Sequence, residues 1–383
     1  MSQPTVFVGM SGGVDSSVSA LLLKEQGYNV IGVYMKNWSK DLPGMKCPWA
    51  EDLADAKRVA VKLGIPFEVW DFEKAYHEKV VEYMLEEFKK GNTPNPDVMC
   101  NQEIKFKLFY EKAMERGADF IATGHYARVL SKKSDTKCSS ELLRAIDENK
   151  DQTYFLYRIS DEALAHTIFP VGGMLKPEVK KLAEEKGLHN AYKKESMGVC
   201  FVGEVGMKDF LKEYIDVKPG EIREIETNKI LGYHEGAVFY TIGQRHGLYL
   251  SGVAGEVNDG MPYYVVKKNL EDNIIYVSKN LNHEAIWTKE LELNEVIMRG
   301  DKFDLQALGA TEINNETSLV MTGTGKETSK MRLLVRLRHR APLIPANFDG
   351  KKLMFESEIK RPASGQSAVL YNSEICLGGG IIV

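Results

Sequence analysis

Apolar and polar positions along the first 200 residues follow the alternation of strands and helices that is typical of an α/β domain. A short apolar run at residues 5–8 leads into a glycine-rich turn, and residues 14–26 then carry apolar side chains at helical spacing. Further strands are expected at 29–34, 66–70 and 120–123, and further helices at 54–63, 76–90 and 104–116. This order predicts a doubly wound parallel sheet with ligands at the carboxyl ends of its strands.

The pattern changes after about residue 205. Residues 206–285 contain short apolar runs separated by Gly and Asn, with strand-like stretches at 261–267 and 273–278. Residues 286–383 show short alternating runs and little helical periodicity, which predicts a β-barrel-like domain. We therefore expect an α/β domain over 1–205, a small central domain over 206–285 and a β-barrel domain over 286–383. Two polar stretches, 132–140 and 311–330, are expected to be surface loops.

Composition narrows the class of protein. The chain has 383 residues, of which 43% are hydrophobic and 27% charged, as in a soluble globular protein. The chain has 50 basic and 54 acidic residues, and the resulting net charge of −4 gives no overall positive field. No apolar run reaches the roughly 18 residues of a membrane span, and no secretory signal is expected. Five scattered cysteines without a CxxC pair argue against a disulfide framework or a zinc site, so a cytoplasmic location is predicted.

The glycine-rich turn is the strongest local signal. Residues 9–17 read GMSGGVDSS and lie between an expected strand and an expected helix. Glycines allow close approach of the backbone to a ligand, and backbone N–H groups at a helix start favour an anion. No Gly-Lys-Ser/Thr follows, so this is not a Walker A loop, and the turn is not GxGxxG either. The alternative is a polar cap that only starts the helix.

Two distant segments place thiols beside other reactive or rigid features. Asp97 precedes Cys100 by three residues in a stretch made rigid by Pro94 and Pro96. Cys200 lies in an apolar run that on its own indicates a buried strand. Each cysteine alone is more simply a small core residue. Two that meet at one sheet edge would suit thiol–disulfide or persulfide chemistry.

A basic segment in the last domain is hidden by the overall charge. Residues 330–361 contain nine Lys or Arg and three acidic residues. In a strand, alternate residues share a face. One alternating set contains Arg332, Arg336, Arg338 and Arg340, and the other contains Leu333, Val335 and Leu337. We expect the arginines to form one phosphate-binding face, the alternative being an ordinary solvated strand.

Seven blocks in a fixed order resemble one enzyme family. They are GMSGGVDSS (9–17), VYMKNW (33–38), TPNPDVMCNQEIKF (93–106), TGHYARV (123–129), KDQTYFLY (150–157), GVCFVG (198–203) and TIGQRHGL (241–248). The first is similar to the SGGxDS loop of the PP-loop ATP pyrophosphatases. Together the blocks resemble the bacterial tRNA-specific 2-thiouridylases over nearly the whole chain. That resemblance implies ATP-dependent 2-thiolation of the wobble uridine 34 of tRNA, with release of AMP and pyrophosphate.

The resemblance also implies roles for individual residues. ATP would be bound by Gly9, Met10, Ser11, Gly12, Gly13, Val14, Asp15, Ser16, Met35 and Gly124. Cys200 would carry sulfur as a persulfide, Cys100 would attack it and form a transient Cys100–Cys200 disulfide, and Asp97 would act as general acid/base. Asn95, Pro96 and Asp97 would contact the target base. The tRNA-binding set would be His125, Lys150, Asp151, Gln152, Arg338, His339 and Gln366, with the central domain also contacting tRNA.

Cofactors and partners follow from the same resemblance. ATP is the expected co-substrate with Mg²⁺ held mainly by its phosphates and Asp15 as a candidate ligand, and no iron–sulfur cluster or zinc is expected. The expected partners are tRNAs for Lys, Glu and Gln with uridine at position 34, and a persulfide donor such as a cysteine desulfurase or a relay protein.

Two rival functions remain. One is a PP-loop enzyme that adenylates another carbonyl without sulfur transfer, and the other is an RNA-binding module without turnover. The residues alone leave open whether the 241–248 block contacts RNA or packs domains together.

Overall fold

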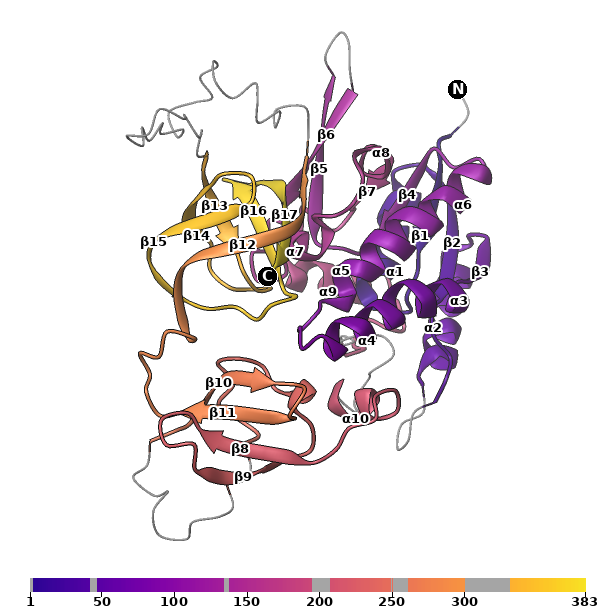
Figure 1. Ribbon diagram of the computed structural model, residues 1–383. Helices are drawn as coiled ribbons and strands as arrows, with labels where there is room; N and C mark the ends of the chain where they lie inside the picture. The colour runs from indigo at the N-terminus through magenta and orange to yellow at the C-terminus, as the bar shows by residue number, and fades with distance from the viewer. Residues whose placement is uncertain are drawn as a thin grey trace.

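The computed structural model describes residues 3–41, 47–133, 138–194, 207–248, 250, 261–299 and 331–383. Figure 1 shows an α/β domain on the right, a barrel at the upper left that contains the C-terminus, and a small β domain below the barrel. The expected fold class, a parallel-sheet domain followed by a small central domain and a C-terminal barrel, is confirmed.

The first domain is built on a five-stranded parallel sheet in the order β3-β2-β1-β4-β7. Its strands are β1 (Thr5–Gly9), β2 (Asn29–Lys36), β3 (Phe67–Asp71), β4 (Phe120–Thr123) and β7 (Thr167–Ile168). Alternate side chains of β1 enter different cores, because Val6 and Val8 pack on one face of the sheet and Phe7 on the other. Helices therefore cover both faces, as a doubly wound sheet requires.

One face is covered by α1 (Val14–Glu25), α2 (Trp49–Leu63) and α9 (Lys176–Glu185). The other is covered by two longer helical stretches, each with a π-helical middle. These are α3 (Glu73–Tyr76), η1 (His77–Val81) and α4 (Glu82–Lys89), and then α5 (Pro96–Met99), η2 (Cys100–Leu108) and α6 (Phe109–Glu115). The short helices are α7 (Thr153–Leu156), α8 (Asp161–Ala165) and α10 (Met207–Lys212). The sequence placed the second long stretch at 104–116, eight residues too late.

The central domain is a four-stranded sheet in the order β10-β11-β8-β9. Its elements are β8 (Gly220–Glu224), β9 (Ile230–His234), the 3₁₀ turn η3 (Ala237–Phe239), β10 (Tyr264–Asn269) and β11 (Ile274–Ser278). A separate small core includes Ile222, Val265 and Ile275, each 0% exposed.

The last domain is a closed six-stranded barrel. Its strands are β12 (Trp287–Met298), β13 (Met331–Arg336), β14 (Ile344–Phe348), β15 (Lys352–Lys360), β16 (Ser367–Asn372) and β17 (Ile375–Ile382). Pairing between β12 and β17 closes the ring, which leaves no free sheet edge within it.

A hairpin of the first domain extends the barrel sheet, which the sequence did not predict. Its strands are β5 (Ala127–Lys133) and β6 (Cys138–Arg144), and β6 pairs with β17 through Leu142 and Leu143. The loop expected at 132–140 is therefore wrong where it overlaps these strands, because its polar residues belong to a paired hairpin. Residues 134–137 and the predicted insertion at 311–330 lie outside the described residues. Within the described ranges, no helix is long and apolar enough to cross a membrane.

Candidate functional site

The residues predicted to bind ATP come together at the carboxyl ends of β1, β2 and β4. A Cβ atom added to Gly9 would lie 2.8 Å from the Met35 Cε, so the tip of the methionine packs directly on the glycine. A Cβ added to Gly124 would lie 2.6 Å from the Ser16 backbone nitrogen. Met35 and Gly124, taken from separate sequence blocks, thus lie directly against the glycine-rich loop.

The loop is held by short polar contacts at the start of α1. Ser16 Oγ and Ser17 Oγ donate to the Gly13 carbonyl at 3.1 and 2.9 Å, and the Ser11 N–H donates to Ser16 Oγ. Gly12 has a φ of +79° and lies so close to the backbone of α2 that a Cβ would come 2.4 Å from the Asp52 oxygen. Backbone N–H groups at this helix start lie where the sequence predicts that an anion binds.

Asn190 braces the same loop and was missed by the sequence reasoning. Its side-chain amide donates to the Gly12 carbonyl at 2.8 Å and to Ser17 Oγ at 2.9 Å, and the residue is 2% exposed. It lies 178 residues from Gly12. No local sequence signal links two positions so far apart.

Lys176 is a second residue that the sequence reasoning missed. Its Nζ lies 2.6 and 2.7 Å from the two carboxylate oxygens of Asp15, and the Tyr126 hydroxyl donates to Asp15 at 3.0 Å. Lys176 is buried in the first turn of α9, where a cation is disfavoured by the helix dipole. That unfavourable position was a usable signal that the lysine serves another group.

The same contacts test Asp15 as a magnesium ligand. Its carboxylate is already occupied by Lys176 and Tyr126, so it does not fit a ready-made metal site. Among the described residues no group of three or more His, Cys, Asp or Glu side chains could hold a metal ion.

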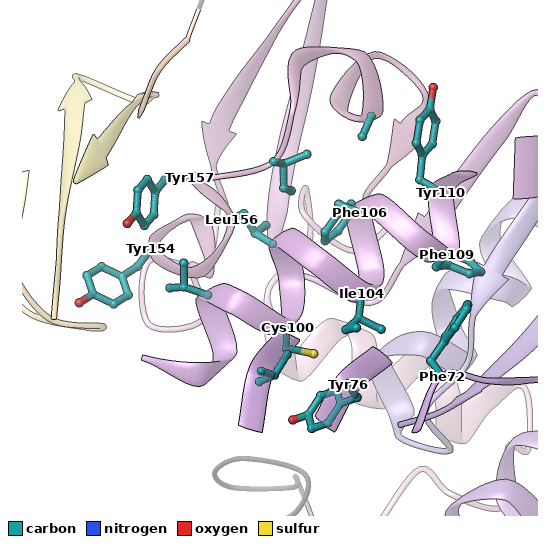
Figure 2. Close-up of a cluster of buried hydrophobic side chains, with 14 of the residues drawn as sticks. Phe72, Tyr76, Cys100, Ile104, Phe106, Phe109, Tyr110, Tyr154, Leu156 and Tyr157 are labelled. Carbon is teal, nitrogen blue, oxygen red and sulfur yellow. The ribbon is translucent and has the colours of Figure 1, made fainter. Parts of the chain in front are cut away.

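The segment with Asp97 and Cys100 starts a helix. The Asn95 side chain caps α5 by accepting from the Val98 N–H at 3.4 Å, and Pro96 occupies the first turn, as helix starts favour. Cys100 begins the π-helical η2 and is 4% exposed. Figure 2 shows its sulfur among Ile104 and Tyr76 in the apolar cluster. A thiol so placed must become accessible before it can react.

A polar cluster links this helix to the end of β4, beside the glycine-rich loop. His125, next to Gly124, contacts Thr123 Oγ1 through Nδ1 at 2.8 Å and Lys105 Nζ through Nε2 at 3.5 Å. Its ring also packs 5.8 Å from Phe106 of η2. Burial, and then the Lys105 charge, hold the pKa of His125 well below its usual value, so its ring is neutral at pH 7.

The Lys105 ammonium that acts on His125 also acts on the Asp97 carboxyl. Burial raises the pKa of the Asp97 carboxyl, and the nearby Lys105 ammonium opposes this rise. A carboxyl whose pKa is raised in this way holds its proton more readily than an exposed carboxyl does, which suits a role in proton transfer. Cys200, predicted as the sulfur carrier, lies outside the described residues.

The predicted tRNA-binding residues 150–152 have different surroundings. Lys150 is partly exposed, whereas Gln152 accepts the Tyr126 N–H at 2.9 Å. Asp151 is 1% exposed and receives the Arg336 guanidinium at 2.5 Å together with the Thr153 hydroxyl. The Asp151 carboxylate therefore faces the barrel domain and is not on the surface.

The predicted arginine face is wrong for Arg336. β13 ends at that residue, and Arg338 and Arg340 lie in the turn that follows. Arg336 does point out of the barrel, as the alternation with Val335 requires, but that outer surface is covered by the first domain. Arg332, Arg338 and Arg340 are exposed.

The remaining predicted tRNA contacts lie where the barrel meets the first domain. The His339 ring packs 4.6 Å from the Phe155 ring. The Gln366 side-chain amide donates to the Thr93 carbonyl at 2.6 Å. Arg338, which directly precedes His339 in the chain, is exposed.

Comparison with known families identifies all three parts of the chain. Residues 4–204 match the family described as the tRNA methyl transferase HUP domain, 208–279 its PRC-barrel domain, and 315–382 an aminomethyltransferase β-barrel domain. A solved structure of a 4-thiouridine synthetase–RNA complex with bound ATP is 20% identical in sequence. The match covers 50% of this chain and 43% of that one, with a TM-score of 0.34.

Curated relatives match over nearly the whole length. A tRNA-specific 2-thiouridylase MnmA of Exiguobacterium sibiricum is 43% identical and covers 99% of this chain and 94% of its own. Proteins of the same name from Listeria welshimeri and Staphylococcus saprophyticus are 45% and 43% identical, covering 98% of this chain and 94% of theirs. The chain therefore belongs to the tRNA-specific 2-thiouridylase family of transferases.

Proposed function

We propose that this protein uses ATP to replace the C2 oxygen of uridine 34 in tRNA by sulfur. The observation that carries the proposal is the assembly of Gly9, Met35, Gly124 and the start of α1 at one edge of the parallel sheet, in a chain of this family. A phosphate-binding loop of this kind favours ATP chemistry over methyl transfer, for which it has no use.

The first step activates the base. ATP bound by Gly9–Ser16 adenylates the C2 oxygen of the uracil and releases pyrophosphate, which turns a poor leaving group into AMP. Lys176, now paired with Asp15 at 2.6 Å, is close enough to the loop to face the phosphates. Mg²⁺ supplied with ATP neutralises phosphate charge. Asn95, Pro96 and Asp97 hold the extruded base, which is cheap to unstack from an anticodon loop.

The second step transfers sulfur. Cys200 carries a persulfide received from a donor such as a cysteine desulfurase or a relay protein. The Cys100 thiolate attacks the inner sulfur, forming the Cys100–Cys200 disulfide and releasing hydrosulfide, which adds to C2 and expels AMP. Asp97 moves the proton, consistent with its raised pKa. A cellular dithiol then reduces the disulfide.

The partners follow from these steps. They are tRNAs for Lys, Glu and Gln that have uridine at position 34. His125, Lys150, Gln152, Arg338, His339 and Gln366 are proposed to border the RNA. Asp151 is proposed to support Lys150 and Gln152 from beneath, because its own carboxylate is buried.

Nucleoside mass spectrometry tests the proposal. The protein would be given unmodified tRNA, Mg·ATP and a persulfide source, and the digested RNA should contain 2-thiouridine at position 34. The product should be absent without ATP and in Cys100→Ser and Cys200→Ser, while both variants still bind tRNA. AMP without thiouridine would favour another adenylating enzyme, and neither product would favour an RNA-binding module.

A further inference from the structure

The segment of residues 91–94 is contacted by both accessory domains, the central domain and the C-terminal barrel. It connects the end of α4 at Lys89 to Asn95, which caps the helix that bears Asp97 and Cys100. The proposed base-binding residues follow it directly in the chain. Anything that fixes this segment therefore fixes where that helix begins.

The barrel holds the segment through one turn. The Thr93 N–H donates to the Ser364 carbonyl at 2.7 Å, and the Gln366 amide donates back to the Thr93 carbonyl at 2.6 Å. Gly365 has a φ of +88°, and a Cβ there would lie 3.0 Å from the Thr93 nitrogen. The turn is itself anchored to the end of β17, because Gly365 and Ile382 are joined by a backbone hydrogen bond of 2.8 Å.

The central domain holds the same segment from β10 and from the 241–248 block. Lys268 Nζ donates to the Gly91 carbonyl at 2.6 Å, at the C-terminal end of α4 where a cation is favoured. Burial lowers the pKa of Lys268 to about 8, and the contact itself is part-buried. Thr241 Oγ1 lies 3.2 Å from Thr93 Oγ1. Thr241, the first residue of the 241–248 block, therefore contributes to packing between the central domain and the first domain.

We propose that residues 91–94 couple RNA engagement by the two accessory domains to the position of the base-binding helix. A shift of either domain must move Thr93, because both domains bond to it, and Thr93 lies two residues before the helix cap. Lys268, Thr241 and Gln366 are then positioning residues. The side-chain amide nitrogen of Gln366 is used on the protein backbone. The inference rests on the proposed function for what the helix does.

Two variants remove the central-domain contacts without approaching the reacting groups. Lys268→Met deletes the bond to Gly91 and keeps the apolar stem, and Thr241→Val deletes the bond to Thr93 with little change of shape. Lys267→Met is the matched control, since Lys267 is the exposed neighbour on β10. Three quantities are compared with the wild type: the thiolation rate at saturating tRNA and ATP, the tRNA Kd, and hydrogen exchange of the peptide covering residues 91–100.

The expected result is a separation of rate from binding. Lys268→Met should lower the saturated rate about tenfold, because the helix loses its preset position, and should leave the tRNA Kd within about twofold. Exchange should quicken at residues 91–100 and stay unchanged elsewhere, and Lys267→Met should match the wild type. Thr241→Val should show the same pattern more weakly.

Three outcomes overturn the inference: an unchanged rate and unchanged exchange, a loss that lies wholly in tRNA affinity, or faster exchange across the entire chain. If wild-type protein makes no thiouridine, the proposed function fails. The exchange data still decide whether the accessory domains fix the 91–94 segment.

Discussion

Two ion pairs of similar geometry lie in very different parts of the molecule. Asp15 and Lys176 approach to 2.6 Å beside the glycine-rich loop, and Asp151 and Arg336 approach to 2.5 Å between the first domain and the barrel. The Asp15 side chain is 28% exposed, whereas those of Asp151 and Arg336 are 0% and 5% exposed. The distances alone do not separate the two pairs.

Their surroundings do separate them. The Asp151 carboxylate also accepts from the Ala145 N–H, the Thr153 N–H and the Thr153 hydroxyl, and Arg336 stacks on Tyr371. Breaking that pair would leave a buried charge without compensation. Asp15 is open to solvent on one side, so an incoming phosphate could replace it as the partner of Lys176. We infer that the buried Asp151–Arg336 pair holds the first domain and the barrel together. The more exposed Asp15–Lys176 pair would open when ATP binds, with a phosphate replacing Asp15.

Arg336→Met should give the largest effect because it leaves Asp151 buried beside the barrel. The free energy of unfolding should fall by about 3 kcal/mol, the low end for a buried pair, since Arg144 still lies 3.6 Å from the carboxylate. Urea denaturation measures it. Arg332→Met is the matched control, because its pair with Glu356 is exposed, and should change stability by under about 1 kcal/mol. An equal loss of unfolding free energy in both variants would mean that burial does not make the Asp151–Arg336 pair more important for stability than an exposed pair.

Lys176→Met should act on ATP rather than on folding. Loss of a charge-assisted contact to phosphate is worth about 1.5–3 kcal/mol, so the KM for ATP should rise roughly 10- to 100-fold. Stability should change little, because the remaining Asp15 is partly hydrated. AMP formation at varied ATP measures the effect, with Lys180→Met on the exposed face of the same helix as control. A normal KM with a large loss of stability would make this pair structural as well.

Much of the fold could be predicted from local pattern. Four of the five strands of the parallel sheet, β1 to β4, and the helix after the glycine-rich loop follow from apolar spacing and glycine positions within a few residues, whereas the two-residue β7 was not predicted. The hairpin β5–β6 could not, because its partner β17 begins more than 230 residues later. The helix bearing Cys100 begins at Pro96, capped by Asn95, and not at the predicted residue 104, because the two prolines were interpreted as a rigid loop.

The candidate site divides in the same way. Gly9, Met35 and Gly124 were predicted from the family resemblance, and the structure brings them together because strand ends in a parallel sheet meet at one edge. Arg336 was misassigned because alternation tells which way a side chain points and not what covers that face. Asp151 and Asn190 have roles set by residues far along the chain, and neither position has a local signal.

Arg338→Ala should weaken tRNA binding while leaving the fold intact. Arg338 is exposed in the turn after β13, two residues from the buried Arg336. Loss of one phosphate contact should lower tRNA affinity several-fold and reduce the slope of log K against log salt by about 1. Filter binding at several salt concentrations measures both. An unchanged slope in Arg338→Ala would show that this turn does not meet RNA.

His339→Gln should give the smallest effect, visible only in the pH dependence of stability. Burial, and then the charges of Arg340 and Arg336, lower the pKa of His339 to about 4, while the unfolded chain keeps a pKa near 6.5. Between pH 6.5 and 4 the unfolded state binds the extra proton, so stability from this residue is present above pH 6.5 and lost as pH falls.

The difference in unfolding free energy between pH 7 and 5 should therefore shrink by about 1 kcal/mol in His339→Gln, below the full shift because the ring is partly hydrated. Urea denaturation at both pH values measures it. If His339→Gln keeps the wild-type difference between the two pH values, the junction beside Asp151 is open to water, and the contrast between the two ion pairs loses its physical basis.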